Sequence, residues 1–228
     1  MNFVSWQRVF VWLGGGAFVA SLAFGMYSYV VTWSNEGTLR PSSIAVNVAL
    51  FTLFAAHHSI FAQPRIKAWV TRVVPAHLVR SVYVWIASVL FIIVCAAWLP
   101  VGAELYRVTG AAAAALAAVQ LAGVACVAAS ARIIDPLELA GIRQRVRNET
   151  LQIKGPYRWV RHPIYLGWIV AVFAAAHMTG DRLLFAIVSS AYLLIAMPWE
   201  ERTLQREFPL EYAAYCRRVK WRVVPYVY

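Results

Sequence analysis

Residues 163–201 read PIYLGWIVAVFAAAHMTGDRLLFAIVSSAYLLIAMPWEE, two apolar runs that are separated by the short polar stretch TGDR and end in two glutamates. Their composition predicts a hairpin of two helices that cross a membrane and are joined by a tight turn. A chain that crosses a membrane twice returns to the face from which it started. We therefore expect Glu200 and Glu201 to lie beside Arg161 and His162.

The rest of the chain has the same membrane character. It is 61% hydrophobic and only 14% charged over 228 residues, more apolar surface than a soluble domain of this length can bury. We therefore expect an all-α, polytopic membrane protein with about six spans, the last two short for a full crossing but tolerable when packed against other helices. The expected spans are about 9–33, 42–61, 81–100, 110–131, 163–178 and 182–198.

The charge pattern predicts the orientation. The net charge is +11, and the basic residues gather in every second segment between the spans. Loop 62–80 holds four basic residues and no acidic one, and segment 132–162 holds seven basic and three acidic residues. By the positive-inside rule, both termini face the cytoplasm. Because the basic residues lie in these loops, the charge indicates a membrane topology and not a nucleic-acid partner.

A cluster of polar and aromatic residues, GPYRWVRHPIYLG, spans 155–167 at the start of the fifth apolar run. Pro163 suits the first position of a helix, and the free N–H groups of a helix N-terminus beside Arg158, Arg161 and His162 favour an anion. Anchoring of these residues at lipid headgroups is the other interpretation. A salt bridge that closes the hairpin is likewise an alternative use of the two glutamates.

The sequence contains GPYRWVRHPIYLGW, a hairpin and then EERTLQREFPLEYAAYCRRV, and this pattern resembles the isoprenylcysteine carboxyl methyltransferase and phospholipid methyltransferase superfamily of membrane enzymes. Pro209 stands where that pattern usually has glycine. HHSIFAQPRIKAW (57–69), VRSVYVW (79–85) and DPLELAGIRQ (135–144) are similar to the bacterial branch that holds methanethiol S-methyltransferases and NnrU-like proteins. The resemblance implies a bacterial inner-membrane protein with an N-terminal four-helix region (1–131) and a C-terminal methyltransferase core (132–228).

The resemblance also implies S-adenosylmethionine as cofactor, bound from the cytoplasmic side, and a small-molecule or lipophilic acceptor reached from the bilayer. No motif suggests a metal site, since the three cysteines form no CxxC or Cys/His cluster. The expected catalytic residues are Arg161, His162 and Glu201. The expected cofactor-binding residues are Tyr157, His162, Tyr165, Gly167, Glu200, Glu201 and Tyr212. The expected acceptor-side residues are His57, Gln144 and Trp168.

The residue types at these positions suit binding of S-adenosylmethionine and methyl transfer. A carboxylate on the cofactor pairs with arginine, an ammonium pairs with glutamate, and a sulfonium meets an aromatic face. An acceptor thiol must become a thiolate, which Arg161 would stabilise while His162 or Glu201 takes the proton. A small thiol acceptor is the leading hypothesis. The alternatives are methylation of an isoprenylcysteine carboxylate or a phospholipid amine, an NADPH-dependent reductase of similar fold, and a non-enzymatic NnrU-like protein.

Overall fold

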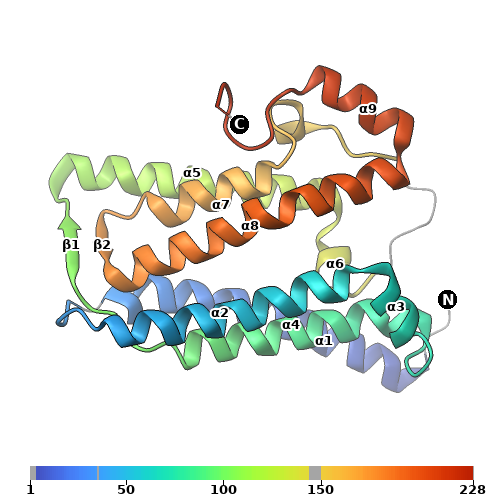
Figure 1. Cartoon of the computed structure of the whole chain (residues 1–228), viewed down its shortest axis with the longest axis horizontal. Helices are drawn as coiled ribbons and strands as arrows, with labels where there is room; N and C mark the ends of the chain where they lie inside the picture. Colours follow the sequence, from blue (N-terminus) through green and yellow to red (C-terminus); the bar gives the residue numbers. More distant parts are fainter. Residues whose placement is uncertain (1–3, 35, 144–149, 228) are drawn as a thin grey trace. The chain divides into compact units, whose positions relative to one another are not determined.

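The computed structural model describes residues 4–34, 36–143 and 150–227, which are mostly helical (Figure 1). The α-helices are α1 (Ser5–Val30), α2 (Pro41–Ala62), α3 (Pro64–Val70), α4 (Val79–Ala96), α5 (Gly110–Ile134), α6 (Pro136–Leu139), α7 (Pro163–Phe173), α8 (Gly180–Glu207) and α9 (Pro209–Arg218). Short 3-10 turns are η1 (Thr32–Ser34), η2 (Ala76–Leu78) and η3 (Gly155–Arg158), and the strands are β1 (Glu104–Arg107) and β2 (His177–Thr179).

The expectation of an all-α polytopic membrane protein is confirmed. Five helical segments in the described part of the chain are long and apolar enough to cross a membrane: Ser5–Ser34, Pro41–Phe61, Ala76–Ala96, Gly110–Ile134 and Gly180–Glu207. The remaining expected span differs from the prediction. Its helix, α7, is apolar but ends at Phe173, so only part of the run 163–178 is helical.

Contacts among the described residues group the chain into two compact units. The first unit contains residues 1–102 and 136–146, and the second contains 103–135 and 147–228. The division at 131/132 that we expect from the sequence stays a prediction about domain organisation.

Buried polar bonds hold the first unit together across its helices. The Asn47 side chain, fully buried on α2, donates to the Leu99 carbonyl at 2.7 Å and accepts from the Leu99 N–H at 2.9 Å. The Ser81 hydroxyl of α4 donates to the Gly141 carbonyl at 2.6 Å. Because a buried polar group without a partner is costly, each of these bonds selects one register between distant segments.

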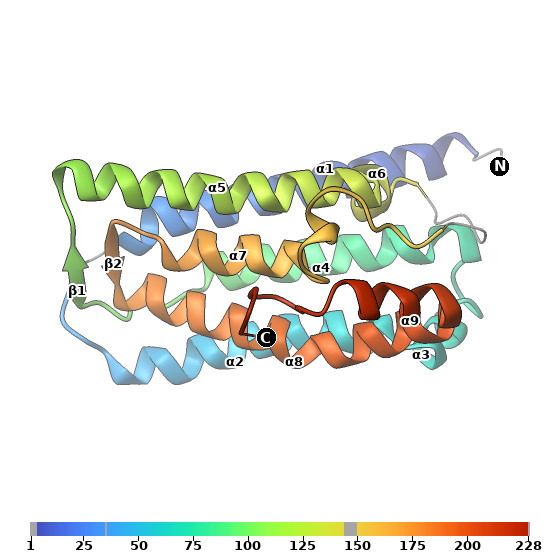
Figure 2. The ribbon, with the colours of Figure 1, turned by 90° about the horizontal axis from the view of Figure 1, so that it is seen from above.

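In the second unit, α7 lies between α5 and α8 (Figure 2). Its contact with α5 depends on Gly123 and Gly167, which bring the two backbones close together. A β-carbon on Gly123 would lie 2.7 Å from the Gly167 carbonyl oxygen. On the α8 side, the Trp168 indole N–H donates to the Ser189 hydroxyl at 2.9 Å, and the Trp168 ring meets Phe185 edge-on.

A short antiparallel β1–β2 pair lies at the end of the second unit opposite α9 (Figure 1). Arg107 is opposite His177, and the Val108 N–H donates to the Ala176 carbonyl at 2.8 Å. The TGDR stretch is therefore not a simple helix–helix turn, since Thr179 ends β2 and caps α8 by accepting from the Arg182 N–H at 3.3 Å. The sequence did not reveal this pair, because four-residue and three-residue strands carry almost no periodic signal.

We expect the Gly123→Ala substitution to destabilise the protein, because its β-carbon would overlap the α7 backbone. Overpacking of this kind costs about 1–3 kcal/mol. Thermal unfolding in detergent measures the effect. Gly16→Ala is the matched control, since a β-carbon at Gly16 meets nothing within 4 Å. Equal melting temperatures for the two variants would contradict the close contact between α5 and α7.

Candidate active site

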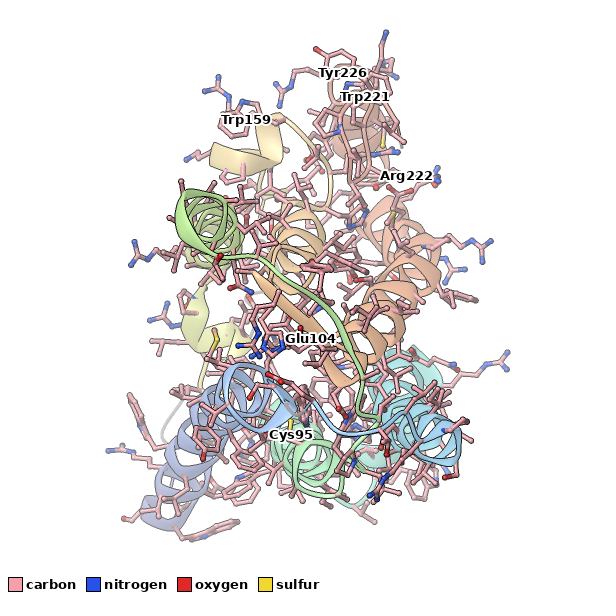
Figure 3. All side chains as sticks on the ribbon, turned by 90° about the vertical axis from the view of Figure 1, so that its left-hand side faces the viewer. Cys95, Glu104, Trp159, Trp221, Arg222 and Tyr226 are labelled. Carbon is pink, nitrogen blue, oxygen red and sulfur yellow. The ribbon has the colours of Figure 1, made fainter. Side chains whose placement is uncertain are left out.

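The start of α7 is held by the C-terminal strap, which we define as residues 219–227. The N–H of Arg161 donates to the Trp221 carbonyl at 2.9 Å, and the N–H of His162 donates to the Arg222 carbonyl at 2.8 Å. Figure 3 shows Trp221, Arg222 and Tyr226 at the same end of the second unit. The strap is fixed from inside by Val219 and Val223, both almost completely buried.

Glu201 is the centre of the polar cluster. Its Oε1 lies 3.3 Å from Arg161 Nε and 3.2 Å from His162 Nε2, and its Oε2 lies 3.2 Å from Arg222 Nε. Glu201 and His162 are both buried. A buried carboxylate needs such partners, because an unpaired charge away from water is very costly. Glu201 thus joins the late part of α8, the start of α7 and the strap.

Glu200 occupies the outer side of this cluster. It accepts a hydrogen bond from the Tyr165 hydroxyl, and its Oε2 lies 3.8 Å from His162 Nδ1. The Glu200 side chain is half exposed. The structure therefore brings both glutamates back to Arg161 and His162, as the hairpin predicts.

A cavity of about 350 Å³ opens beside the Glu201 cluster. It is lined by Arg161, Pro198, Glu201, Arg202, Gln205, Tyr212, Ala213, Cys216 and Arg222. Its volume is within the usual range for a small-molecule site. Positive and negative groups both face it, which suits a zwitterionic ligand.

Tyr212 presents a buried hydroxyl at the cavity wall, beside the Cys216 thiol. Its side chain is 4% exposed, and its hydroxyl makes no hydrogen bond of normal geometry among the described residues. Burial and the charge of Glu201 raise the pKa of Tyr212, so the group is a neutral hydroxyl. A buried hydroxyl at a cavity wall without a bond is most easily explained by a bound ligand.

Helix α9 connects this wall to the segment before α7. The Tyr215 hydroxyl donates to the Tyr157 carbonyl at 2.8 Å, and burial, followed by the Glu200 charge, raises the pKa of the Tyr157 phenol. Pro209, the departure from the family pattern, is the first residue of α9. Proline suits that position because its missing N–H would have no helical partner there.

Several predicted residues lie away from the cavity lining. Gly167 lies against α5, and Trp168 packs between α7 and α8 with its N–H bonded to Ser189. His57 belongs to the first unit, where its ring stacks on Tyr83 at 5.7 Å and both ring nitrogens are buried without a hydrogen bond. Gln144 lies outside the described residues. The acceptor role of His57, Gln144 and Trp168 stays a prediction.

Sequence reasoning missed four polar residues of the lining. Gln205 follows Glu201 by four residues on α8, and this helical spacing indicates that the two side chains share a face of the helix. Arg202 comes directly after Glu201 and carried no such signal. Cys216 follows Tyr212 by four residues on α9 and carried the same signal. Arg222 carried none, since a strap without regular structure has no periodicity.

Comparisons with known proteins identify the family of this chain. The profile of the isoprenylcysteine carboxyl methyltransferase family matches residues 137–210. A methanethiol S-methyltransferase of Bradyrhizobium diazoefficiens is 34% identical over 214 residues, covering 89% of this chain and 82% of the relative. This chain belongs to the isoprenylcysteine carboxyl methyltransferase family. It is therefore a membrane methyltransferase, and it needs a methyl donor.

Other relatives have the same name. A methanethiol S-methyltransferase of Mycobacterium tuberculosis is 39% identical over 186 residues, covering 78% of this chain and 76% of the relative. A methanethiol S-methyltransferase of Pseudomonas deceptionensis is 32% identical over 197 residues, covering 82% of this chain and 74% of the relative. No solved structure matches the chain.

We expect Arg222→Ala to weaken binding of the methyl donor. It removes the partner of Glu201 Oε2 and one wall of the cavity. The Arg222 side chain is 35% exposed, so solvent screening limits its ion pair with Glu201 to about 1 kcal/mol, and we expect about a fivefold rise in KM for the donor.

Steady-state kinetics in detergent measures this effect. Arg218→Ala is the matched control, because Arg218 is an exposed arginine on α9 that does not line the cavity. The same rise in both variants, or none in either, would contradict a positioning role for Arg222.

Proposed function

We propose that this methyltransferase uses S-adenosylmethionine to methylate a small thiol such as methanethiol. The observation that supports the donor most directly is the cavity, where Arg161, Arg222 and Glu201 face the unbonded Tyr212 hydroxyl. The observation that supports the acceptor is that relatives which match most of the chain are named methanethiol S-methyltransferases.

The residues present fit this cofactor. Its carboxylate needs a cation, which Arg161 and Arg222 offer, and its ammonium and ribose hydroxyls need acceptors, which Glu201 and Gln205 offer. The cofactor would also give the Tyr212 hydroxyl a hydrogen bond of normal geometry. When bound, S-adenosylmethionine supplies an electrophilic methyl group on a sulfonium.

The protein must then orient the acceptor and handle one proton. A thiol of ordinary pKa, about 8.5, is mostly protonated near neutral pH and is a poor nucleophile until it loses that proton. Arg161 supplies positive charge that stabilises a thiolate. His162 is the better proton acceptor of the two candidates, because both oxygens of Glu201 already have cationic partners. Glu201 then holds Arg161 and His162 in place.

The topology that accompanies this function is also a proposal. Six crossings with both termini in the cytoplasm follow from the basic loops, and they place the Glu201 cluster on the cytoplasmic side. A bacterial inner membrane is the expected location. The acceptor, which is small and dissolves in lipid, would arrive from the bilayer.

The test follows a labelled methyl group. Purified protein in nanodiscs receives methyl-labelled S-adenosylmethionine and, in separate reactions, methanethiol, a prenylated cysteine or a phospholipid. We expect label in dimethyl sulfide. Label in the prenyl or lipid product would support the methyl donor and contradict the proposed acceptor. If no label is transferred and S-adenosylhomocysteine does not bind, the proposed donor is wrong as well.

The Glu201→Gln, His162→Ala and Arg161→Ala variants belong to the same experiment. Each removes a partner from the buried cluster, and we expect turnover to fall about a hundredfold or more while the protein remains in the membrane. Arg218→Ala again serves as the control. Normal turnover in all three cluster variants would show that the chemistry takes place elsewhere.

A further inference from the structure

Cys216 has a setting that the proposed methyl transfer does not use. Its sulfur lies 2.9 Å from Arg161 Nη1, and the residue is partly exposed and lines the cavity. Three arginines, Arg161, Arg202 and Arg222, line the same cavity. Cysteines that react readily are found in electropositive, partly exposed surroundings of this kind.

A second observation places a ligand beside this sulfur. Tyr212 precedes Cys216 by one helical turn of α9, so both side chains lie on the same face of the helix. The Tyr212 side chain lines the cavity, is more than nine-tenths buried and has a hydroxyl without a hydrogen bond of normal geometry. A molecule that enters the cavity and contacts Tyr212 therefore comes next to the Cys216 sulfur.

The other two cysteines have different surroundings. Cys95 is buried within the apolar helix α4 and does not line the cavity. Cys126 lies on α5, with its sulfur 3.4 Å from the Pro163 carbonyl, and it does not line the cavity either. The chain thus carries two internal reference thiols for the reactivity of Cys216.

We propose that Cys216 is a site of reversible thiolation by small disulfides, which blocks the cavity. In the reaction, the Cys216 thiolate attacks one sulfur of a dialkyl disulfide R–S–S–R. A new bond forms between Cys216 Sγ and that sulfur, the old S–S bond breaks, and its electron pair leaves on the thiolate R–S⁻. The Cys216 proton passes to water, and a free thiol reverses the exchange.

The consequence for the methyltransferase rests on the proposed function. A small thiol acceptor is oxidised to a disulfide of this class, so the oxidised form of the acceptor would close the site that methylates the reduced form. The attached group takes up space in the cavity and displaces the Cys216 sulfur from Arg161. Both effects oppose binding of the methyl donor.

Dimethyl disulfide is the probe for this experiment. The full-length protein in detergent is treated with it, and mass spectrometry of peptides follows the methylthio group on each cysteine over time. We expect Cys216 to react about tenfold faster than Cys95 and Cys126, S-adenosylhomocysteine to slow it by a similar factor, and dithiothreitol to reverse it. Calorimetry should show that S-adenosylhomocysteine binding is lost in proportion to the modified fraction.

Cys216→Ser is the deciding variant, with Cys126→Ser as its matched control. Whatever binding Cys216→Ser retains should be the same before and after treatment, while Cys126→Ser should lose binding as the parent protein does. Equal reactivity of the three thiols, or binding that survives thiolation of Cys216, would overturn the proposal. Thiol modification and binding of S-adenosylhomocysteine are both measured without a methyl acceptor. A failure to methylate methanethiol would therefore refute the proposed acceptor without affecting the test of Cys216.

Discussion

Three segments that are far apart in the chain meet at one carboxylate. Glu201 on α8 contacts Arg161 and His162 before α7 and Arg222 on the strap, and it is largely shielded from water. Removing one partner of such a buried ion pair costs about 3–5 kcal/mol, while replacing the whole set with apolar groups is often neutral. Stability alone therefore does not explain this cluster. The cluster instead holds the cationic side chains in fixed positions at the cavity wall.

Contacts around the Glu201 cluster also fix the position of its side chains. Backbone bonds from Arg161 and His162 to the strap set where the cluster begins, and the close approach at Gly123 and Gly167 sets where α7 runs. On the other side of the cavity, α9 contributes Tyr212 and Cys216. Helices α8 and α9, the segment before α7 and the strap thus hold the charged and polar groups of the cavity through direct contacts with one another.

Some of this arrangement was predictable from sequence. The apolar runs gave the helices, and the return of the hairpin placed Glu200 and Glu201 near Arg161 and His162, because a membrane crossing has only two faces. Arg222 was not predictable, since no regular structure carries the strap back to α7. Gly167 and Trp168 were assigned to ligands from a motif, but their packing against α5 and α8 depends on partners that spacing along one helix does not reveal.

The ending of α7 at Phe173 has a consequence for how the membrane part is assembled. Eleven helical residues rise about 16 Å, roughly half the hydrocarbon thickness of a bilayer, and the chain then continues through residues 174–176 into the strand β2. An extended strand cannot form hydrogen bonds between its own N–H and C=O groups, and lipid offers no hydrogen-bond partners. Here β1 supplies the hydrogen-bond partners for β2, and Arg107 of β1 lies 70 residues before its neighbour His177. In the proposed topology of six crossings, this segment therefore does not enter the membrane as an independent helix, because β2 needs β1 as its partner strand.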